Sequence, residues 1–524
     1  MSFIHVVVVD TAQIQPYVFG SNRLRENIGA SHLVALATGA WATALLEPGE
    51  LVYAGGGNVV ARFEEADRAG QFVRSLSRRA LAEAPGLRLV AETQEFAPGW
   101  LRAAVRAAFE RLADRKRGAA QSAPLLGLSV TERCGTTGLP ATARTLEVAG
   151  DPSSVYPASS EVLCKRAAAE AARDRLADPR EGAPPGRDFD FPADFSDLGR
   201  SVGEDSYIAV VHADGNGLGK RIQALGEGGA EDEAYAEAVG SFSASLHRLS
   251  LEALRVTVGR LRSHYTDSRT GLWDRIPLRQ TGRSGVFLPM RPLVFGGDDV
   301  TFVCDGRLGP ALAECYLQAF ERLTRDLPGG PATACAGVAI VKTQYPFARA
   351  YALAEDLCRS AKGLHRRLKE EGRGEQACLD WHFTSSGLFG GLGEIRGREY
   401  RGGDLTLRPV SLGGAGGVRR WETVRRGIDA FQGRDWAERR SKVKALRDAL
   451  REGPEAVRHF CLYFNRSADD ADGLLPDVGR PRVSRERGWE ADPLSVGSAS
   501  RCVYFDAVEL FDHFVALDAP GDTP

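Results

Sequence analysis

The stretch Pro292-Leu-Val-Phe-Gly-Gly-Asp-Asp299-Val-Thr-Phe-Val303 places two glycines and two aspartates between apolar, β-forming residues. This pattern predicts two strands joined by a tight turn. Adjacent carboxylates repel each other unless a cation neutralises them, and a hard divalent ion prefers oxygen ligands. The stretch therefore predicts a hairpin whose tip, Asp298 and Asp299, can hold Mg²⁺ or Mn²⁺. Taken by itself, the motif is also explained by an ordinary turn.

The chain contains an internal repeat around this hairpin. Two apolar runs end in Asp, at Asp10 and at Asp214, and a Gly-rich hairpin pattern follows each of them. The order β-α-β-β-α-β, seen twice, is typical of ferredoxin-like domains. The predicted elements are a strand at 3–10, a helix at 21–46, a hairpin at 51–60, a helix at 64–84, a strand at 87–94 and a helix at 98–117, and then a strand at 207–214, a helix at 235–264, a hairpin at 292–303, a helix at 309–326, a strand at 333–341 and a helix at 346–369.

Asp214 ends a strand that neighbours the hairpin in this topology, so it can supply a third carboxylate beside Asp298 and Asp299. Three carboxylates around two metals suit in-line attack on phosphorus. Residues that would contact phosphate surround this set: the loop after Asp214, the hairpin glycines and a lysine on the last helix of the repeat. These candidates are Gly217, Gly219, Lys220, Gly296, Gly297 and Lys362. For Lys362, a solvated surface lysine is the alternative interpretation.

Composition excludes several classes of protein. The 524 residues include 67 Lys and Arg against 69 Asp and Glu, so the chain is not basic overall, although local basic patches remain open. With 43% hydrophobic and 26% charged residues it is typical of a globular protein. The N terminus lacks the basic region of a signal peptide, and the uncharged run at 30–46 is better interpreted as a buried helix than as a membrane span. We therefore expect a cytoplasmic protein without membrane contact.

At these residues the chain resembles the large-subunit polymerase of type III CRISPR complexes and, more distantly, the palm of diguanylate cyclases with a GGDEF motif. The matching pieces are Ala213 to Lys220, Phe295 to Asp299, Cys335 to Val341, Tyr345-Pro346 and Ala354 to Lys362, with an echo of the first palm at Asp10 to Gln15 and Leu24 to Ser31. The resemblance covers most of residues 1–385. It implies two palm domains that face each other, with nucleotides bound between them. It also implies synthesis of cyclic oligonucleotide messengers, usually from ATP.

The resemblance assigns roles to particular residues. It implies that Asp214 and Asp298 are metal carboxylates with Asp299 beside them, and that the carbonyl of Gly215 is a further ligand. Lys362 and the loop 217–220 would contact the triphosphate. The acceptor nucleotide would lie on the first palm, where Ser21, Asn22 and Arg25 are candidates; a helix cap and a surface cation are equally good interpretations of these three.

The sequence departs from the family pattern at several positions. Asn216 stands where the family often has a carboxylate, and Gly57 and Asn58 stand where the second palm has Asp298 and Asp299, so the first palm is not expected to hold two metals. Cys134 alone remains of the family's zinc-binding cysteines, and no two of the nine cysteines form a Cys-x-x-Cys pair, so we expect no zinc. Without a His-Asp dipeptide, we also expect no HD nuclease activity.

The predicted fold class is α+β, with two ferredoxin-like palm domains, a connector and a small helical C-terminal domain. The predicted domains are a degenerate first palm at 1–120, a connector with a helix at 160–176 and a linker at 178–200 within 121–200, a second palm at 201–385, and a Gly-rich loop (387–417) with helices at 421–431, 436–452, 455–464 and 501–517 within 386–524.

Three functions remain open at this point. The first is a nucleotidyltransferase that makes cyclic oligonucleotides from NTPs, with ATP favoured, in antiviral defence. The second is an RNA-guided CRISPR effector scaffold whose synthesis depends on RNA or partner subunits, with basic clusters at 115–117, 365–369 and 439–444; solvated helix faces also explain these clusters. The third is a nucleotide-binding sensor without catalysis. The chain could act as a monomer or a homo-oligomer.

Overall fold

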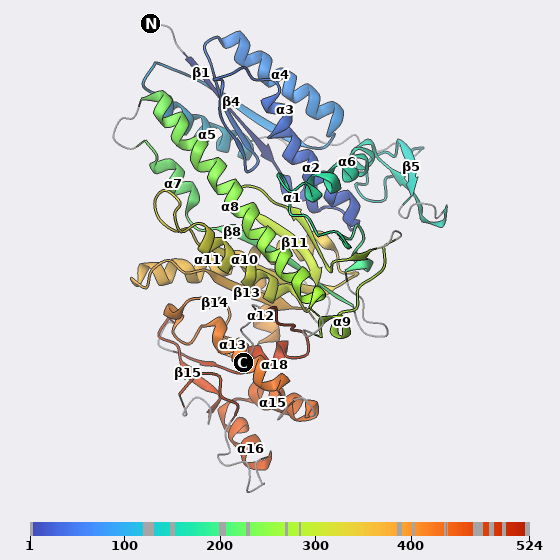
Figure 1. The fold of residues 1–524 in the computed structure, drawn as a ribbon, viewed down its shortest axis with the longest axis vertical. Coiled ribbons are helices and arrows are strands. Elements are labelled where there is room, and N and C mark those ends of the chain that lie inside the picture. Colours follow the sequence, from blue (N-terminus) through green and yellow to red (C-terminus); the bar gives the residue numbers. More distant parts are fainter. Residues whose placement is uncertain are drawn as a thin grey trace.

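The computed structural model describes residues 4–118, 130–146, 152–198, 206–226, 231–267, 271–281, 285–384, 390–400, 404–433, 436, 439–464, 475–481, 487–494 and 499–518. Two sheets with the same strand topology lie one above the other in Figure 1, and the C-terminal helices lie at the opposite end from the first sheet. The predicted α+β fold with two ferredoxin-like palms is confirmed. Parts of the predicted linker and Gly-rich loop (199–200, 387–389 and 401–403) lie outside the described residues.

The first palm is an antiparallel sheet of order β2-β3-β1-β4. Its central strand carries four consecutive valines, Val6 to Val9, because both faces of the sheet are covered: Val7 and Val9 lie in one buried cluster and Val6 and Val8 in another. One prediction was wrong: the single helix expected at 21–46 is broken near Gly39, which has non-helical backbone angles. The elements are β1 (Ile4–Ala12), α1 (Ile14–Phe19), α2 (Leu24–Ala37), α3 (Ala40–Thr43), β2 (Leu51–Gly55), β3 (Asn58–Phe63), α4 (Ala66–Glu83), β4 (Arg88–Phe96) and α5 (Leu101–Gly118).

The second palm repeats this order as β10-β11-β8-β12 and extends the sheet with β13 and β14. β13 runs parallel to β12, within the second palm predicted at 201–385 but outside its β-α-β-β-α-β repeat. The elements are β8 (Tyr207–Gly215), α7 (Leu218–Ala224), α8 (Asp232–Thr266), α9 (Leu272–Arg275), β10 (Met290–Val294), β11 (Val300–Asp305), α10 (Gly309–Leu323), β12 (Ala334–Lys342), α11 (Phe347–Glu370), β13 (Cys378–Phe383) and β14 (Val410–Ser411).

The connector and the C-terminal helices complete the fold. The connector helix α6 begins after Ser159, whose side chain accepts a hydrogen bond from the Val162 amide. The C-terminal helices share one hydrophobic core with the second palm. The elements are β5 (Ala143–Leu146), β6 (Val155–Ala158), α6 (Ser160–Ala177), β7 (Phe189–Asp190), β9 (Val286–Phe287), α12 (Leu392–Glu399), α13 (Trp421–Gln432), α15 (Arg440–Glu452), α16 (Pro454–Phe464), β15 (Trp489–Ala491), β16 (Ser500–Cys502) and α18 (Phe505–Leu510). The last helix is shorter than the predicted 501–517.

The two palms pack directly on each other. Phe19 of α1 stacks on Tyr351 of α11 with ring centroids 3.8 Å apart. The Asn22 side chain accepts a hydrogen bond of 2.9 Å from the Phe347 amide at the start of α11. The long helix α8 lies along its own palm and also contacts β2 of the first palm (Figure 1). These contacts hold the two hairpins of the repeat face to face. No helix in the described part of the chain is long and apolar enough to span a membrane.

Candidate active site

The Gly-Gly-Asp-Asp stretch forms the predicted hairpin between β10 and β11. Antiparallel pairing aligns Val300 with Ala213, which places Asp299 opposite Asp214 at the end of the central strand. A Cβ atom on Gly215 would lie 3.2 Å from the Cβ of Asp298, so the two backbones approach closely at this point. Gly296 and Gly297 have φ angles of 107° and 89°, which only glycine adopts easily. The structure therefore brings together the three predicted carboxylates.

His212 joins this group and was missed by the sequence analysis. One ligand atom each from His212, Asp214 and Asp299 lies within 4.8 Å of the others, a spacing that fits a metal ion. The His212 Nδ1 atom lies 3.1 Å from the Thr301 hydroxyl. Residues two apart on a strand point to the same face, so the His-Ala-Asp spacing at the end of β8 was the available signal. A site with both imidazole and carboxylate ligands suits a divalent transition ion, whereas carboxylates alone suit Mg²⁺.

The carboxylates oppose each other electrostatically. Burial raises the pKa of Asp298, and the nearby Asp214 raises it further. Asp299 keeps contact with solvent in the cavity described below, yet the surrounding protein and the charges of Asp298 and Asp214 raise its pKa well above the ordinary value. Burial also lowers the pKa of His212, which leaves a neutral imidazole able to ligate. A divalent cation would relieve this repulsion, so the residues present fit the expected metal.

Lys362 lies at the same site, but it does not point to open solvent. Its ammonium group forms an ion pair with Asp214 and donates a hydrogen bond of 3.1 Å to the Gly215 carbonyl. Burial lowers the pKa of Lys362, but the Asp214 carboxylate outweighs this and raises it overall. The ammonium therefore contacts two of the groups that the sequence analysis assigned to a metal. The alternative of a solvated surface lysine does not fit this placement.

The loop after Asp214 divides into two parts. Gly217 begins α7 with a φ of 67°, and together with Gly219 and Lys220 it is exposed beside the site. Asn216 is buried and donates a hydrogen bond of 2.9 Å to the Thr333 hydroxyl. The position where the family often has a carboxylate is thus filled by an amide that supports the loop.

The first palm carries a counterpart of this site in which an amide replaces the second carboxylate. Lys116 of α5 forms an ion pair with Asp10 and donates a hydrogen bond of 3.0 Å to the Thr11 carbonyl, as Lys362 does with Asp214 and Gly215. Strand pairing sets Asn58 opposite Asp10. With its amide nitrogen facing Asp10, Asn58 donates to both carboxylate oxygens, at 2.9 and 3.1 Å. The charge of Asp10 is therefore neutralised by the protein itself.

The three candidates for the acceptor nucleotide lie elsewhere. The Ser21 hydroxyl donates a hydrogen bond of 2.7 Å to Glu26, and Asn22 caps α11 as described above. Arg25 is half-buried on α2. None of the three is among the residues that line the cavity between the hairpins. For Ser21 and Asn22, these contacts favour the structural interpretation.

A cavity of about 850 Å³ separates the two hairpins and is open to solvent. Its walls include Asp298 and Asp299 from the second palm and residues 51–57 from the first. A Cβ atom on Gly297 would come within 3.1 Å of the Gly56 Cα, so the hairpin tips touch at one edge of this space. A volume of this size is in the range of small-molecule and cofactor sites.

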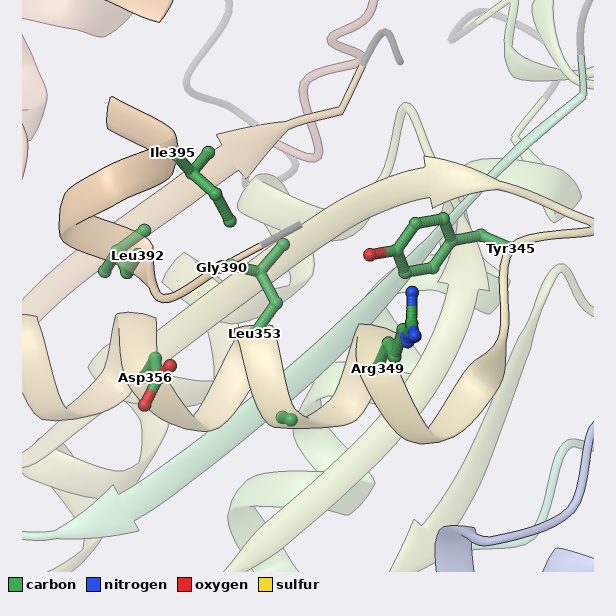
Figure 2. Close-up of a pocket in the computed structure, with 8 residues that line it drawn as sticks. Tyr345, Arg349, Leu353, Asp356, Gly390, Leu392 and Ile395 are labelled. Atoms are coloured by element: carbon green, nitrogen blue, oxygen red, sulfur yellow. The ribbon is translucent and has the colours of Figure 1, made fainter. Parts of the chain in front are cut away.

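A smaller pocket of about 290 Å³ lies beside α11 of the second palm and shares no residue with the cavity between the hairpins. Figure 2 shows it between the first turns of α11 and the start of α12, with the Tyr345 hydroxyl beside Arg349 and the apolar side chains of Leu392 and Ile395 opposite. None of the predicted site residues lines it.

Comparisons with known proteins agree with this geometry. Residues 207–369 match the family model of the Cas10/Cmr2 second palm domain. No curated protein sequence matches the chain. Among solved structures, the Csm1–Csm4 cassette in complex with cA4 is 14% identical with a TM-score of 0.52, covering 97% of this chain and 69% of that one. The cassette in complex with AMPPNP (14%, TM-score 0.53, 98% and 70%) and Csm1 of T. onnurineus (14%, TM-score 0.51, 98% and 70%) are similarly close.

At 14% identity these structures establish a shared fold over nearly the whole chain, and the family model adds a sequence-level match over the segment that contains the three carboxylates. Residues 207–369 therefore match a Cas10/Cmr2 second palm domain, and the chain as a whole shares its fold with Csm1.

Proposed function

We propose that the chain is a metal-dependent nucleotidyltransferase that makes cyclic oligonucleotides from NTPs, with ATP as the favoured substrate. The observation that carries this proposal is that Asp214 lies beside Asp298 and Asp299, which line a cavity large enough for nucleotides. The similar Csm1–Csm4 structures, which are described as complexes with AMPPNP, cA3 and cA4, support the choice of substrate and product.

The chain's own residues would position the reactants. Asp214, Asp298 and Asp299, with the Gly215 carbonyl and His212 as further donors, would hold the divalent ions. Bound there, Mg²⁺ or Mn²⁺ would supply positive charge for the reacting phosphate and lower the pKa of the attacking hydroxyl. Gly296 and Gly297 allow the hairpin backbone to lie close to a phosphate. Lys362 and the exposed Lys220 would stabilise the negative charge of the leaving pyrophosphate.

Mass spectrometry of the products tests this directly. The purified chain is incubated with each NTP and Mg²⁺ or Mn²⁺, beside a variant carrying Asp298→Ala and Asp299→Ala. We expect a cyclic product from the wild type and none from the variant, since this chemistry depends on positioning and charge neutralisation. A variant that still turns over substrate would disprove the assignment of these carboxylates.

A second candidate is synthesis that depends on a partner. The similar structures contain Csm1 together with Csm4, and one is described as a subcomplex of a type III-A CRISPR-Csm interference complex. We therefore propose that a Csm4-type subunit, rather than a second copy of this chain, is the first partner to add when the isolated chain makes no product. Product formation that appears only with that subunit would support this candidate.

The basic clusters give less support to direct RNA binding. In the first cluster, Lys116 pairs with Asp10 and Arg115 with Glu92. In the second, Lys369 pairs with Glu375. Cations already paired with carboxylates release fewer counterions on binding RNA. A shallow dependence of RNA affinity on salt is therefore expected, and a steep one would favour the scaffold function.

A further inference from the structure

Arg175 brings a guanidinium group from the connector to the wall of the cavity between the hairpins. It lies in the last turn of α6, and its Cζ atom is 4.6 Å from the centroid of the Phe295 ring. Phe295 directly precedes the Gly-Gly-Asp-Asp turn, so Arg175 is held at the root of the second hairpin. The connector thereby contributes Arg175, Arg180 and Glu181 to the wall of a space between the two palms.

This guanidinium has no anionic partner among the described residues. It forms no ion pair and donates no hydrogen bond there, and it lies over the Phe295 ring. Burial lowers the pKa of Arg175, and the nearby Glu181 opposes this effect without forming an ion pair. A partly buried arginine is normally paired with a carboxylate or a phosphate, so an unpaired one beside a cavity indicates a missing anion.

The side chains around Arg175 do not supply that anion. His32 of α2 is buried in the same wall, and burial together with Arg175 lowers its pKa to about 4, so it is neutral at pH 7. Burial, with Arg175 and Arg255, lowers the pKa of His247 in the same way. The His32 Nδ1 atom is buried without a hydrogen-bond partner in the described structure. Beside Arg175 the wall therefore holds the neutral rings of His32 and His247, together with the Glu181 carboxylate, which forms no ion pair with Arg175.

Two neighbouring arginines show the contrast. Arg180 also lines the cavity, but it is bound to Asp178 by hydrogen bonds of 3.0 and 3.3 Å. Arg173, on the same helix as Arg175, is paired with Asp190. Arg175 is thus the one of these three arginines that lines the cavity and forms no ion pair with a carboxylate of the described residues.

We propose that Arg175 binds a phosphate group of a nucleotide in the cavity between the two hairpins. This inference rests on the proposed function, since it takes the cavity to hold nucleotides. α6 packs on α2 of the first palm, while Arg175 reaches Phe295 of the second hairpin, so the contact lies where both palms border the cavity. Arg175 is thus a binding residue that positions a nucleotide, whereas Ser21, Asn22 and Arg25, to which the sequence analysis gave such a role, do not line the cavity.

Binding without turnover tests the proposal. Each of the four NTPs and each matching nucleoside is titrated calorimetrically into the full chain in EDTA, where metal-dependent transfer and metal-dependent binding do not contribute. The variants are Arg175→Met, Arg175→Lys and, as a matched control from the same helix, Arg173→Met. Circular dichroism and thermal unfolding verify that each variant is folded.

We expect Arg175→Met to weaken binding of the preferred NTP by about 10- to 100-fold, as is typical for loss of a charge-assisted hydrogen bond. Nucleoside binding should not change, Arg175→Lys should retain part of the NTP affinity, and Arg173→Met should match the wild type. NTP binding unchanged in Arg175→Met, an equal loss of nucleoside and NTP, or no NTP binding by the wild type would each overturn the proposal. If the variants change NTP binding as expected but the wild-type chain makes no product, only the proposed synthesis is contradicted.

Discussion

Gly297 of the second hairpin touches Gly56 of the first: a Cβ atom at Gly297 would come within 3.1 Å of the Gly56 Cα. The contact is one of backbone against backbone, so neither residue has a flexible side chain that could move aside. It fixes how closely the two palms approach at the edge of the cavity. A side chain at Gly297 must displace the Gly56 backbone, whereas a Cβ atom on Gly56 would meet open space.

Gly297→Ala should therefore lower both the free energy of unfolding and the yield of cyclic product. Gly297 has a φ of 89°, a conformation that costs other residues about 1–2 kcal/mol, and the added methyl group also meets Gly56. We expect a loss of about that size in urea unfolding and a larger relative loss of cyclic product. Gly259, on α8 with open space around it, is the control: Gly259→Ala should be neutral or slightly stabilising. Equal stability of the two variants would contradict the contact.

The two lysines of the repeat should respond differently to metal. Lys362→Met and Lys116→Met each break an ion pair with a partly exposed aspartate, which should cost about 1–3 kcal/mol, between the values for exposed and buried pairs. In the second palm, Mg²⁺ can replace the lost charge because Asp298 and Asp299 lie beside Asp214. Thermal unfolding with EDTA or Mg²⁺ should show rescue of Lys362→Met only. Rescue of both variants would indicate a metal site in the first palm as well.

Asn58→Asp should replace two hydrogen bonds to Asp10 by repulsion between two carboxylates. The wild-type amide faces both oxygens of Asp10, whereas a new carboxylate would oppose them, and burial already raises the pKa of Asp10. We expect the variant to unfold at a lower temperature than the wild type in EDTA. Added Mg²⁺ should recover part of the loss, because the change restores a carboxylate pair like Asp214 and Asp299. A variant as stable as the wild type in EDTA would show that Asn58 does not face Asp10.

Asp299→Asn should stabilise the metal-free protein at neutral pH. The native pKa of Asp299 lies well above the ordinary value of 3.8, so the folded state binds this proton more tightly than the unfolded state does. Stability therefore falls as the pH rises from the ordinary value through the raised one, and this loss is complete at higher pH. The gain in Asp299→Asn should disappear as the pH is lowered toward 3.8.

Asp178 provides the control for this prediction. Hydrogen bonds from Arg180 lower the pKa of Asp178, which is the opposite direction. Asp178→Asn should therefore give no stabilisation at neutral pH. Urea unfolding of both variants from pH 4 to pH 8 in EDTA makes the comparison, and a gain that does not depend on pH would contradict the electrostatic explanation for Asp299.

The sequence predicted the parts of the site that local pattern encodes. Apolar, β-forming runs and Gly-rich turns predicted both hairpins, and the strand order of a ferredoxin-like domain predicted Asp214 beside Asp299. His212 was not predicted, because the site was inferred from the aspartate that ends the strand. Residues two apart on a strand point to the same face, so the sequence does place His212 beside Asp214.

Other features depend on contacts between distant segments and have no local signal. Arg175 belongs to a helix that the sequence predicts, but its position beside Phe295 follows from how α6 packs on α2. The similarity of Lys116 to Lys362 is visible only once both helices are placed on their sheets. In the same way, Asn22 could be recognised as a cap for α11 only in the folded chain, because 325 residues separate it from Phe347.

The cap that Asn22 places on α11 has a mechanical consequence. Lys362 lies fifteen residues after Phe347 on α11, which is about 22 Å along the helix axis. The first turn of this helix is hydrogen-bonded to Asn22 of the other palm. A small tilt at this first turn becomes a larger sideways displacement at the far end. Rotation between the palms would thus act as a lever on the contact between Lys362 and Asp214, and a subunit that changed their angle could adjust that contact from the opposite end of the helix.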